Sequence, residues 1–385
     1  MKNAFLEEAK TKFALAEFIT STNRLSMGEQ CEKFESSFAK KQGRLSSILF
    51  NSGGSANLAL LQALRNIDAL KIGDRVAFSA LTWSTNTMPI IQMGFEPVAL
   101  DCELENLNVS ASIVEKQYFH KPFKALFLTN VLGFTADIGS IRAFCESKDI
   151  LLIEDNCESL GTEVSGIKTG NFGLASSFSF YVAHHMSTIE GGMVCTDDEE
   201  LSDMLKIVRA NGWDRNLNPQ KQSKLRAEHS ISDFEANYTF YDLGFNLRPT
   251  EITGFLGQYQ LQFLDATITQ REQNYLAIEE TIISNPDFHT LSHDHISRLS
   301  TFAIPIICKS KGLRDKYLEK FELAGIETRP MIAGNMQRQP YYAKYVTESY
   351  QLPNTDLIHS HGFYCGNYPE LLKDEIQLIT SCLSQ

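Results

Sequence analysis

The sequence predicts an α/β protein in which a mainly parallel sheet lies between two layers of helices. Its 385 residues are enough for two structural lobes. Short apolar runs alternate with segments of helical periodicity, as expected for strands that are buried on both faces of a parallel sheet. From residue 285 onward the strands and helices become shorter. We therefore expect a large N-terminal domain over residues 1–262 and a smaller C-terminal α/β domain over residues 263–385.

Composition and charge argue against several classes of function. The formal net charge is -12, which disfavours binding to nucleic acid or to an anionic membrane because the phosphates would be repelled. Neither a signal-peptide core nor a membrane-spanning run is visible, so we expect a cytoplasmic protein. The eight cysteines are scattered without a CxxC pair or a His/Cys cluster. This spacing predicts free thiols, with neither a metal site nor an iron–sulfur cluster.

The first half begins with two expected helices, followed by a strand at residues 47–50. This strand runs into the turn Asn51–Asn57, and leucines at helical spacing follow. A strand, a glycine–serine turn and a helix start together form an anion site, because unpaired helix N–H groups and hydroxyls point at the bound group. Gly54 and Ser55 are therefore candidate phosphate ligands.

The remaining elements continue the alternation. Further strands are expected at residues 75–79, 97–101, 125–129 and 150–155, with helices between them. Ligands of such sheets bind beyond the carboxyl ends of the strands, so Gly54, Asp155 and the turn after Ser179 should meet at one edge. Beyond this edge we expect a helix over residues 198–209, a polar loop over 211–238 and one long helix from Glu251 to about Glu279.

Two residues at strand ends suggest a flat, cationic ligand. Asp155 ends an apolar strand, where an unpaired carboxylate is costly. It either caps a helix or holds a cationic group such as a pyridinium nitrogen. Trp83 follows another strand end, where its indole either packs in the core or stacks on a flat ring. Together with the phosphate-type turn, these residues describe a site for a flat, phosphorylated and protonated heterocycle, and pyridoxal phosphate fits that description.

The segment Ser177–Gly192 lacks the residue that such a cofactor normally requires. Enzymes that use pyridoxal phosphate hold it through a lysine Schiff base. This segment contains no lysine and carries two adjacent histidines instead, His184 and His185.

Four motifs resemble those of the DegT-like sugar aminotransferases of fold type I, which act on nucleotide-linked keto-sugars. They are Asn51–Asn57, Glu154–Glu158, Ser179–Gly192 and Gly244–Ile252. The resemblance covers essentially the whole chain. It implies the fold type I architecture of pyridoxal-phosphate-dependent transferases, and a homodimer with shared active sites.

Within this family, the Schiff-base lysine falls on His184. That substitution resembles a small branch, the 3-dehydrases of 3,6-dideoxysugar biosynthesis, and the segment from Arg329 to Arg338 resembles it too. One type in the branch carries an iron–sulfur cluster and works with a reductase on CDP-4-keto-6-deoxyglucose. The other has no cluster and acts on GDP-4-keto-6-deoxymannose. This sequence lacks the closely spaced cluster cysteines and resembles the second type.

The resemblance implies a lyase-type reaction that supplies deoxysugars for lipopolysaccharide O-antigen. Pyridoxamine phosphate would be the working cofactor, L-glutamate the expected amino donor, and the C-3 hydroxyl of a nucleotide-linked 4-keto-6-deoxyhexose the leaving group. Imidazole suits the proton steps because its ordinary pKa lies near neutrality, and it cannot form the covalent link that favours amino transfer. The alternatives are a nucleotide-sugar aminotransferase, the reductase-coupled dehydrase and a non-catalytic sensor.

Carried over residue by residue, the resemblance also implies roles at the cofactor. His184 is the acid/base. The phosphate ligands are Gly54, Ser55, Ser179 and, from a second subunit, Asn246. Trp83 covers the ring, Asp155 holds its nitrogen and Glu158 faces its hydroxyl edge.

The same resemblance implies roles toward the substrates. Arg248, also from the second subunit, is a candidate for the amino-acid carboxylate or the substrate phosphates. Arg329, Asn335 and Arg338 either contact the nucleotide sugar or form a structural turn. His185 lies beside the substrate site, where it either supports His184 or simply packs.

Overall fold

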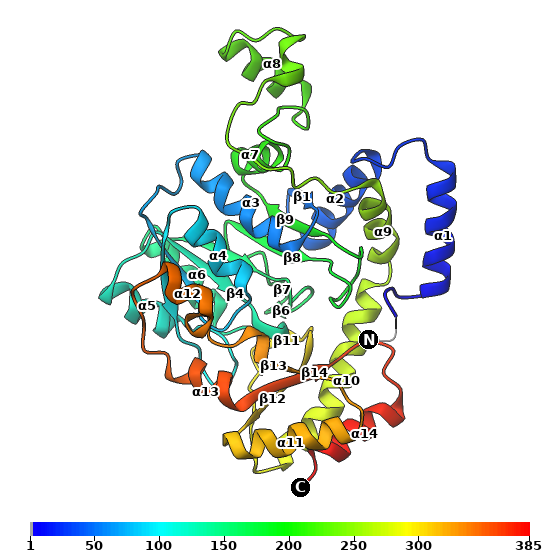
Figure 1. Ribbon diagram of the computed structural model, residues 1–385, viewed down its shortest axis with the longest axis vertical. Helices are drawn as coiled ribbons and strands as arrows, with labels where there is room; N and C mark the ends of the chain where they lie inside the picture. Colours follow the sequence, from blue (N-terminus) through cyan, green and yellow to red (C-terminus); the bar gives the residue numbers. More distant parts are fainter. Residues whose placement is uncertain (1–2) are drawn as a thin grey trace.

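The structure, a computed structural model that describes residues 3–385, is built around a seven-stranded sheet (Figure 1). The strand order is β1-β9-β8-β5-β4-β2-β3, and only β9 runs antiparallel to its neighbours. The strands are β1 (Ser46–Phe50), β2 (Arg75–Ser79), β3 (Glu96–Leu100), β4 (Ala125–Thr129), β5 (Leu151–Asp155), β8 (Ala175–Ser179) and β9 (Gly192–Thr196). The predicted mainly parallel sheet is confirmed.

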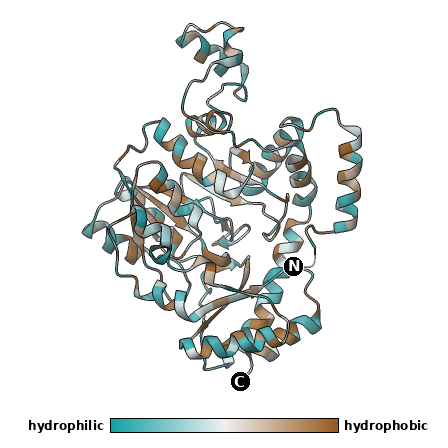
Figure 2. Cartoon of the chain, viewed as in Figure 1, coloured by the Kyte–Doolittle hydropathy of each residue, from teal (hydrophilic) through white to brown (hydrophobic). Residues whose placement is uncertain are grey.

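Alternation along the strands buries both faces of this sheet. Ile48 and Phe50 face one apolar cluster with α3, α4 and α7, whereas Leu49 between them faces another with α2. On the β2–β5 half, α5 and α6 cover that second face. The helices are α1 (Glu8–Ser21), α2 (Glu29–Gln42), α3 (Gly53–Asn66), α4 (Ser84–Gln92), α5 (Ala111–His120), α6 (Ile138–Ser147) and α7 (Glu199–Arg209). Figure 2 shows hydrophobic residues gathered along the strands and the inner sides of the helices.

The C-terminal part forms its own antiparallel sheet in the order β10-β12-β14-β13. Its strands are β10 (Phe288–His289), β12 (Ala303–Cys308), β13 (Thr328–Pro330) and β14 (Gly362–Gly366), and its helices include α11 (Lys311–Leu323), α12 (Pro340–Tyr345), α13 (Pro353–His361) and α14 (Lys373–Leu383). A small third sheet joins β6 (Glu163–Val164) and β7 (Ile167–Lys168) to β11 (Ile296–Arg298). A buried cluster with Leu81, Phe134 and Met331 connects the C-terminal sheet to the large one.

Two expectations about helices were wrong. The long helix expected from Glu251 to Glu279 is two helices, α9 (Glu251–Leu261) and α10 (Leu264–Ser284), because the chain tightens at Phe263, whose N–H donates to the Gln260 carbonyl. The segment expected as a polar loop contains α8 (Pro219–Glu228). Its start is well specified: the Asn218 side chain accepts the Lys221 N–H, and proline occupies the first turn.

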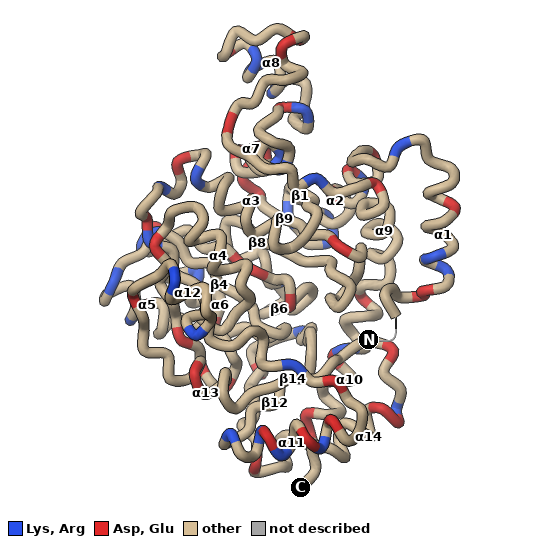
Figure 3. The backbone as a smooth tube through the Cα atoms, viewed as in Figure 1, with Lys and Arg blue, Asp and Glu red and all other residues tan. Residues whose placement is uncertain are grey.

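Charged residues lie mainly on the outer helices and loops (Figure 3). No helix of the described residues is both long and apolar enough to cross a membrane. The carboxyl ends of β1, β2, β4, β5 and β8 meet at one edge of the large sheet, because these strands run in the same direction. This edge faces the C-terminal sheet across a cavity.

Gly192 allows β1 and β9 to approach each other at this edge. A Cβ at Gly192 would lie 2.2 Å from the Ser52 carbonyl oxygen. We expect Gly192→Ala to lower the free energy of unfolding by about 2–3 kcal/mol, because backbone on both sides must move. Urea denaturation measures this. Gly139→Ala is the control. Gly139 lies in α6 with open space around it, so the free energy of unfolding of this variant should equal or exceed that of the wild type. Equal effects of the two substitutions would contradict the prediction.

Candidate functional site

A cavity of about 980 Å³ lies at the carboxyl edge of the sheet, a volume suited to a cofactor together with part of a substrate. One wall comes from the turns after the strands of the large sheet. The other comes from the C-terminal sheet and from α10. Of the predicted site residues, the cavity is lined by Gly54, Trp83, Asp155, Glu158, Ser179, His184 and Arg329.

The glycine–serine turn begins α3 directly beneath the end of β8. Ser52 caps the helix, since its hydroxyl accepts the Ser55 N–H at 3.1 Å. A Cβ at Gly53 would lie 2.7 Å from the Ser179 Cβ, so only glycine permits this approach. Ser52 and Gly54 line the cavity. Ser55 does not belong to its lining, and its hydroxyl lies 3.0 Å from that of Ser52. Ser52 is thus a cavity hydroxyl that the sequence analysis did not single out.

Asp155 ends β5 as a buried carboxylate held by two amides. Its Oδ2 accepts N–H groups from Asn57 at 2.9 Å and from Asn86 at 2.7 Å, and its Oδ1 accepts the Cys157 N–H. No helix follows β5, so the alternative that Asp155 caps a helix was wrong. These three donors leave Asp155 fixed, partly satisfied and open to the cavity.

Glu158 and Trp83 border the same space. The Glu158 carboxylate accepts the Leu132 N–H at 2.9 Å. Burial raises its pKa to about 8, to which the nearby Asp155 charge contributes. Trp83 immediately precedes α4, and its side chain is more than half exposed at the cavity, so it is not a core residue. Thr85, in the first turn of α4, also lines the cavity and was not predicted.

The two histidines follow β8 in an irregular turn and have different surroundings. His184 lines the cavity, and its Nδ1 is buried without a hydrogen-bond partner. Burial lowers its pKa to about 3, with a further contribution from the Arg271 charge, so the ring is neutral near pH 7. His185 is buried behind it, and its Nε2 lies 3.1 Å from the Ser300 carbonyl oxygen. His185 is therefore buried and does not belong to the cavity lining.

Several predicted substrate residues lie elsewhere. Asn246 and Arg248 are exposed, bond to each other at 3.0 Å and do not line the cavity of their own chain. Asn335 and Arg338 also lie outside its lining, where both donate to the Asp356 carboxylate at 2.7 Å. Bonds of this kind are expected if Asn335 and Arg338 form a structural turn. Arg329 is exposed at the cavity and paired with Glu327.

Comparisons with known proteins point in one direction. The model of the DegT/DnrJ/EryC1/StrS aminotransferase family matches residues 7–384. A GDP-4-keto-6-deoxy-D-mannose 3-dehydratase from Yersinia pseudotuberculosis is 33% identical over 371 residues, which cover 95% of this chain and 94% of the relative. A crystal structure of a GDP-4-keto-6-deoxymannose-3-dehydratase mutant with bound GDP-perosamine superposes with a TM-score of 0.91 at 30% identity. It covers 97% of both chains. A structure of such an enzyme with a trapped PLP-glutamate geminal diamine has a TM-score of 0.89 at 31% identity, also with 97% coverage of both chains.

Burial of His185 predicts acid sensitivity. The folded protein keeps His185 neutral, with a pKa well below its ordinary value because of burial. The unfolded chain takes up that proton below about pH 6.5. This contribution to stability is therefore complete above pH 6.5 and declines as pH falls. Between pH 7 and pH 5 this residue should lower the free energy of unfolding by about 2 kcal/mol.

We expect His185→Gln to be less stable than the wild type at pH 7, but to lose less stability on going to pH 5. Urea denaturation at both values measures the difference. His120→Gln, at an exposed position at the end of α5, is the control and should retain the full wild-type loss. If His185→Gln lost as much stability as the wild type, His185 would not be held neutral in the fold.

Proposed function

The chain belongs to the DegT/DnrJ/EryC1/StrS aminotransferase family, and we propose that within it the chain is a 3-dehydratase of a nucleotide-linked 4-keto-6-deoxyhexose. The enzyme uses pyridoxal and pyridoxamine phosphate, with GDP-4-keto-6-deoxymannose as the substrate and L-glutamate as the amino donor. The named relatives support this assignment. The reaction belongs to the biosynthesis of 3,6-dideoxysugars for lipopolysaccharide.

The observation that carries the proposal is the chemistry of the cavity wall at His184. Among the described residues that line the cavity none is a lysine, and His184 occupies the turn where the family's lysine is expected. An imidazole can exchange protons but cannot form a Schiff base with an aldehyde. The wall is therefore equipped for acid/base chemistry and not for covalent attachment of the cofactor.

The residues present fit the cofactor. The close approach of Gly53 to Ser179 forms a cradle beside the N-terminus of α3, where N–H groups and hydroxyls suit a phosphate. The Asp155 carboxylate suits a protonated ring nitrogen, and the Trp83 side chain is free to cover a ring. When bound, pyridoxamine phosphate supplies an amine that condenses with the sugar ketone, and a ring that accepts electrons.

The chain's own residues would then manage protons and orientation. His184, whose ring is neutral near pH 7, would take a proton and return it toward the departing C-3 hydroxyl. The amides of Asn57 and Asn86 would hold the Asp155 carboxylate in place beside the ring nitrogen. Glu158 would face the ring's hydroxyl edge, where a carboxyl with a pKa of about 8 can share a proton. Arg329 would contact the sugar nucleotide.

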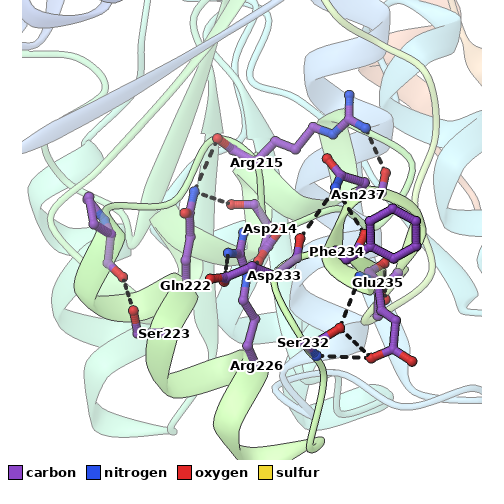
Figure 4. A network of polar contacts seen from close by, with 12 residues as sticks. Asp214, Arg215, Gln222, Ser223, Arg226, Ser232, Asp233, Phe234, Glu235 and Asn237 are labelled. Atoms are coloured by element: carbon purple, nitrogen blue, oxygen red, sulfur yellow. Dashed lines mark hydrogen bonds and ion pairs between the residues drawn. The ribbon is translucent and has the colours of Figure 1, made fainter.

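We further propose a cytoplasmic homodimer with shared sites. Asn246 and Arg248 do not line the cavity of their own chain, so a second copy would have to supply them. They follow an arm, residues 211–243, that projects beyond α7 (Figure 1). The arm is braced internally: Arg226 pairs with Asp214 and Asp233 (Figure 4). Its exposed large apolar side chains, Phe234, Tyr238, Phe240 and Leu243, suit burial against a partner subunit.

All eight cysteines are free, as expected for a protein of the reducing cytoplasm.

The proposed reaction predicts a defined stoichiometry. With GDP-4-keto-6-deoxymannose, pyridoxal phosphate and glutamate, we expect a sugar that has lost one oxygen and gained no nitrogen. One 2-oxoglutarate and one ammonia should form for each sugar. Mass spectrometry and an ammonia assay measure these products, and His184→Asn should lower their rate of formation about 100- to 10,000-fold. An aminosugar product would instead establish the aminotransferase alternative. A requirement for a reductase would establish the reductase-coupled one, and no turnover on any nucleotide 4-keto-6-deoxyhexose would favour a sensor.

Shared sites predict complementation between two defective variants. His184→Asn removes the acid/base, and Asn246→Asp places a carboxylate against the phosphate of the neighbouring site. Each variant alone should retain only a small residual activity. Mixed after mild dissociation, they should recover about a quarter of wild-type activity, because random mixed dimers contain one intact site. If both residues served the same chain's site, mixing would recover nothing.

A further inference from the structure

Arg271 is a buried cation in the cavity wall, and its guanidinium is hydrogen-bonded to backbone carbonyls. It lies in the middle of α10, only 4% exposed, and lines the cavity beside His184. Burial lowers its pKa to about 10, so the side chain is still charged at neutral pH. A buried charge is costly unless it is paired and hydrogen-bonded, and here the carbonyl acceptors and the charge of Glu370 both stabilise the guanidinium.

Within the described chain, the guanidinium bonds to backbone carbonyls from three separate segments. Nη2 donates to the His184 carbonyl at 3.3 Å, and Nη1 donates to that of Phe302 at 2.8 Å and to that of Asn367. Phe302 immediately precedes β12, and Asn367 immediately follows β14. One planar side chain thus fastens the histidine turn to two strands of the C-terminal sheet, which the several fixed donors of arginine make possible.

The contacts around this fastening point are mutually supporting. The Asn367 side chain donates back to the Arg271 carbonyl at 2.9 Å and to the Thr301 hydroxyl at 2.7 Å. The Phe302 ring meets the His184 ring edge-on at 5.1 Å between centroids. The histidine turn itself belongs to no strand, and its own backbone bonds are few, among them His184 N–H to the Tyr181 carbonyl. The C-terminal sheet therefore supplies much of what fixes the His184 ring.

We propose that Arg271 is a positioning residue that holds His184 at the cavity wall by tying its backbone carbonyl to Phe302 and Asn367. The inference rests on the proposed function, because it assigns Arg271 to the acid/base of that reaction.

The test is Arg271→Gln, which keeps a polar side chain but loses the charge and most of the donors. We expect kcat to fall about 10- to 100-fold, as for a misplaced catalytic group, while KM for both substrates and the cofactor Kd stay unchanged. The same fall is expected in the half-reaction of the pyridoxal phosphate enzyme with glutamate, followed by cofactor absorbance. A rise in KM for one substrate with kcat intact would show that Arg271 binds that substrate, and would overturn the proposal.

A double-mutant cycle separates positioning from general stability. In a His184→Asn background, Arg271→Gln should cause no further loss of the residual activity, because it acts through His184. Additive losses would overturn the proposal. The matched control is Arg44→Gln, which removes another buried guanidinium bound to backbone carbonyls, those of Gly170 and Gly173. Arg44 precedes β1 at the opposite edge of the sheet, so this variant should lower Tm and leave kcat unchanged.

If Arg271→Gln does not fold, Asn367→Ala replaces it in the same cycle. That variant keeps the cation but removes the side-chain bonds to Arg271 and Thr301, and it should give a smaller kcat loss that again vanishes in the His184→Asn background. The half-reaction also keeps the two proposals apart. A wild-type chain that reacts with glutamate but forms no deoxysugar would overturn the proposed function. The role of Arg271 could then still be tested, because the rates of Arg271→Gln and the wild type can be compared in the half-reaction with glutamate.

Discussion

The site depends on a buried carboxylate whose position is set by three strands and two helices at once. Asp155 stays at the end of an apolar strand because Asn57 and Asn86 donate to the same oxygen. Asn57 lies in the first turns of α3, after β1, and Asn86 lies in α4, after β2. The bonds therefore fix the two helix starts relative to β5. Because Gly53 and Gly54 belong to that same helix start, the phosphate-type turn is positioned by the carboxylate as well.

The C-terminal sheet completes this arrangement from the other side. The C-terminal part supplies two of the three carbonyls that accept from Arg271, the Phe302 ring against His184, and the Ser300 carbonyl near His185. Burial of the ring and the positive charge of Arg271 both oppose protonation of His184. Burial also pushes Glu158, another residue of the cavity lining, toward its neutral form. Near pH 7 the cavity wall therefore carries a neutral imidazole at His184 and a carboxyl at Glu158 that can keep its proton.

Sequence patterns predicted the edge of the sheet but not the contacts that brace it. Strand ends, the glycine turn and the histidine pair follow from apolar runs and local residue types, so Asp155, Gly54 and His184 could be located in advance. Asn86 is a single amide in a helix, and Arg271 is separated from His184 by 87 residues. Neither belongs to a local pattern, because each acquires its role only when distant segments pack. The break at Phe263 was missed for a related reason, since nothing in the residue types there opposes a continuous helix.

In the proposed function, His184 stands where the family's lysine is expected, and this would change what the rest of the cavity must do. A covalent link would retain a cofactor whatever the quality of its other contacts. Without one, retention would depend on the proposed phosphate cradle, the Asp155 carboxylate, the Trp83 face and the residues proposed to come from a second subunit. Those contacts come from different strands and helices, so each must be held to within a fraction of an ångström. The close glycine approaches, the doubly bonded Asp155 and the braced histidine turn can be understood together as the rigidity that a non-covalent site requires.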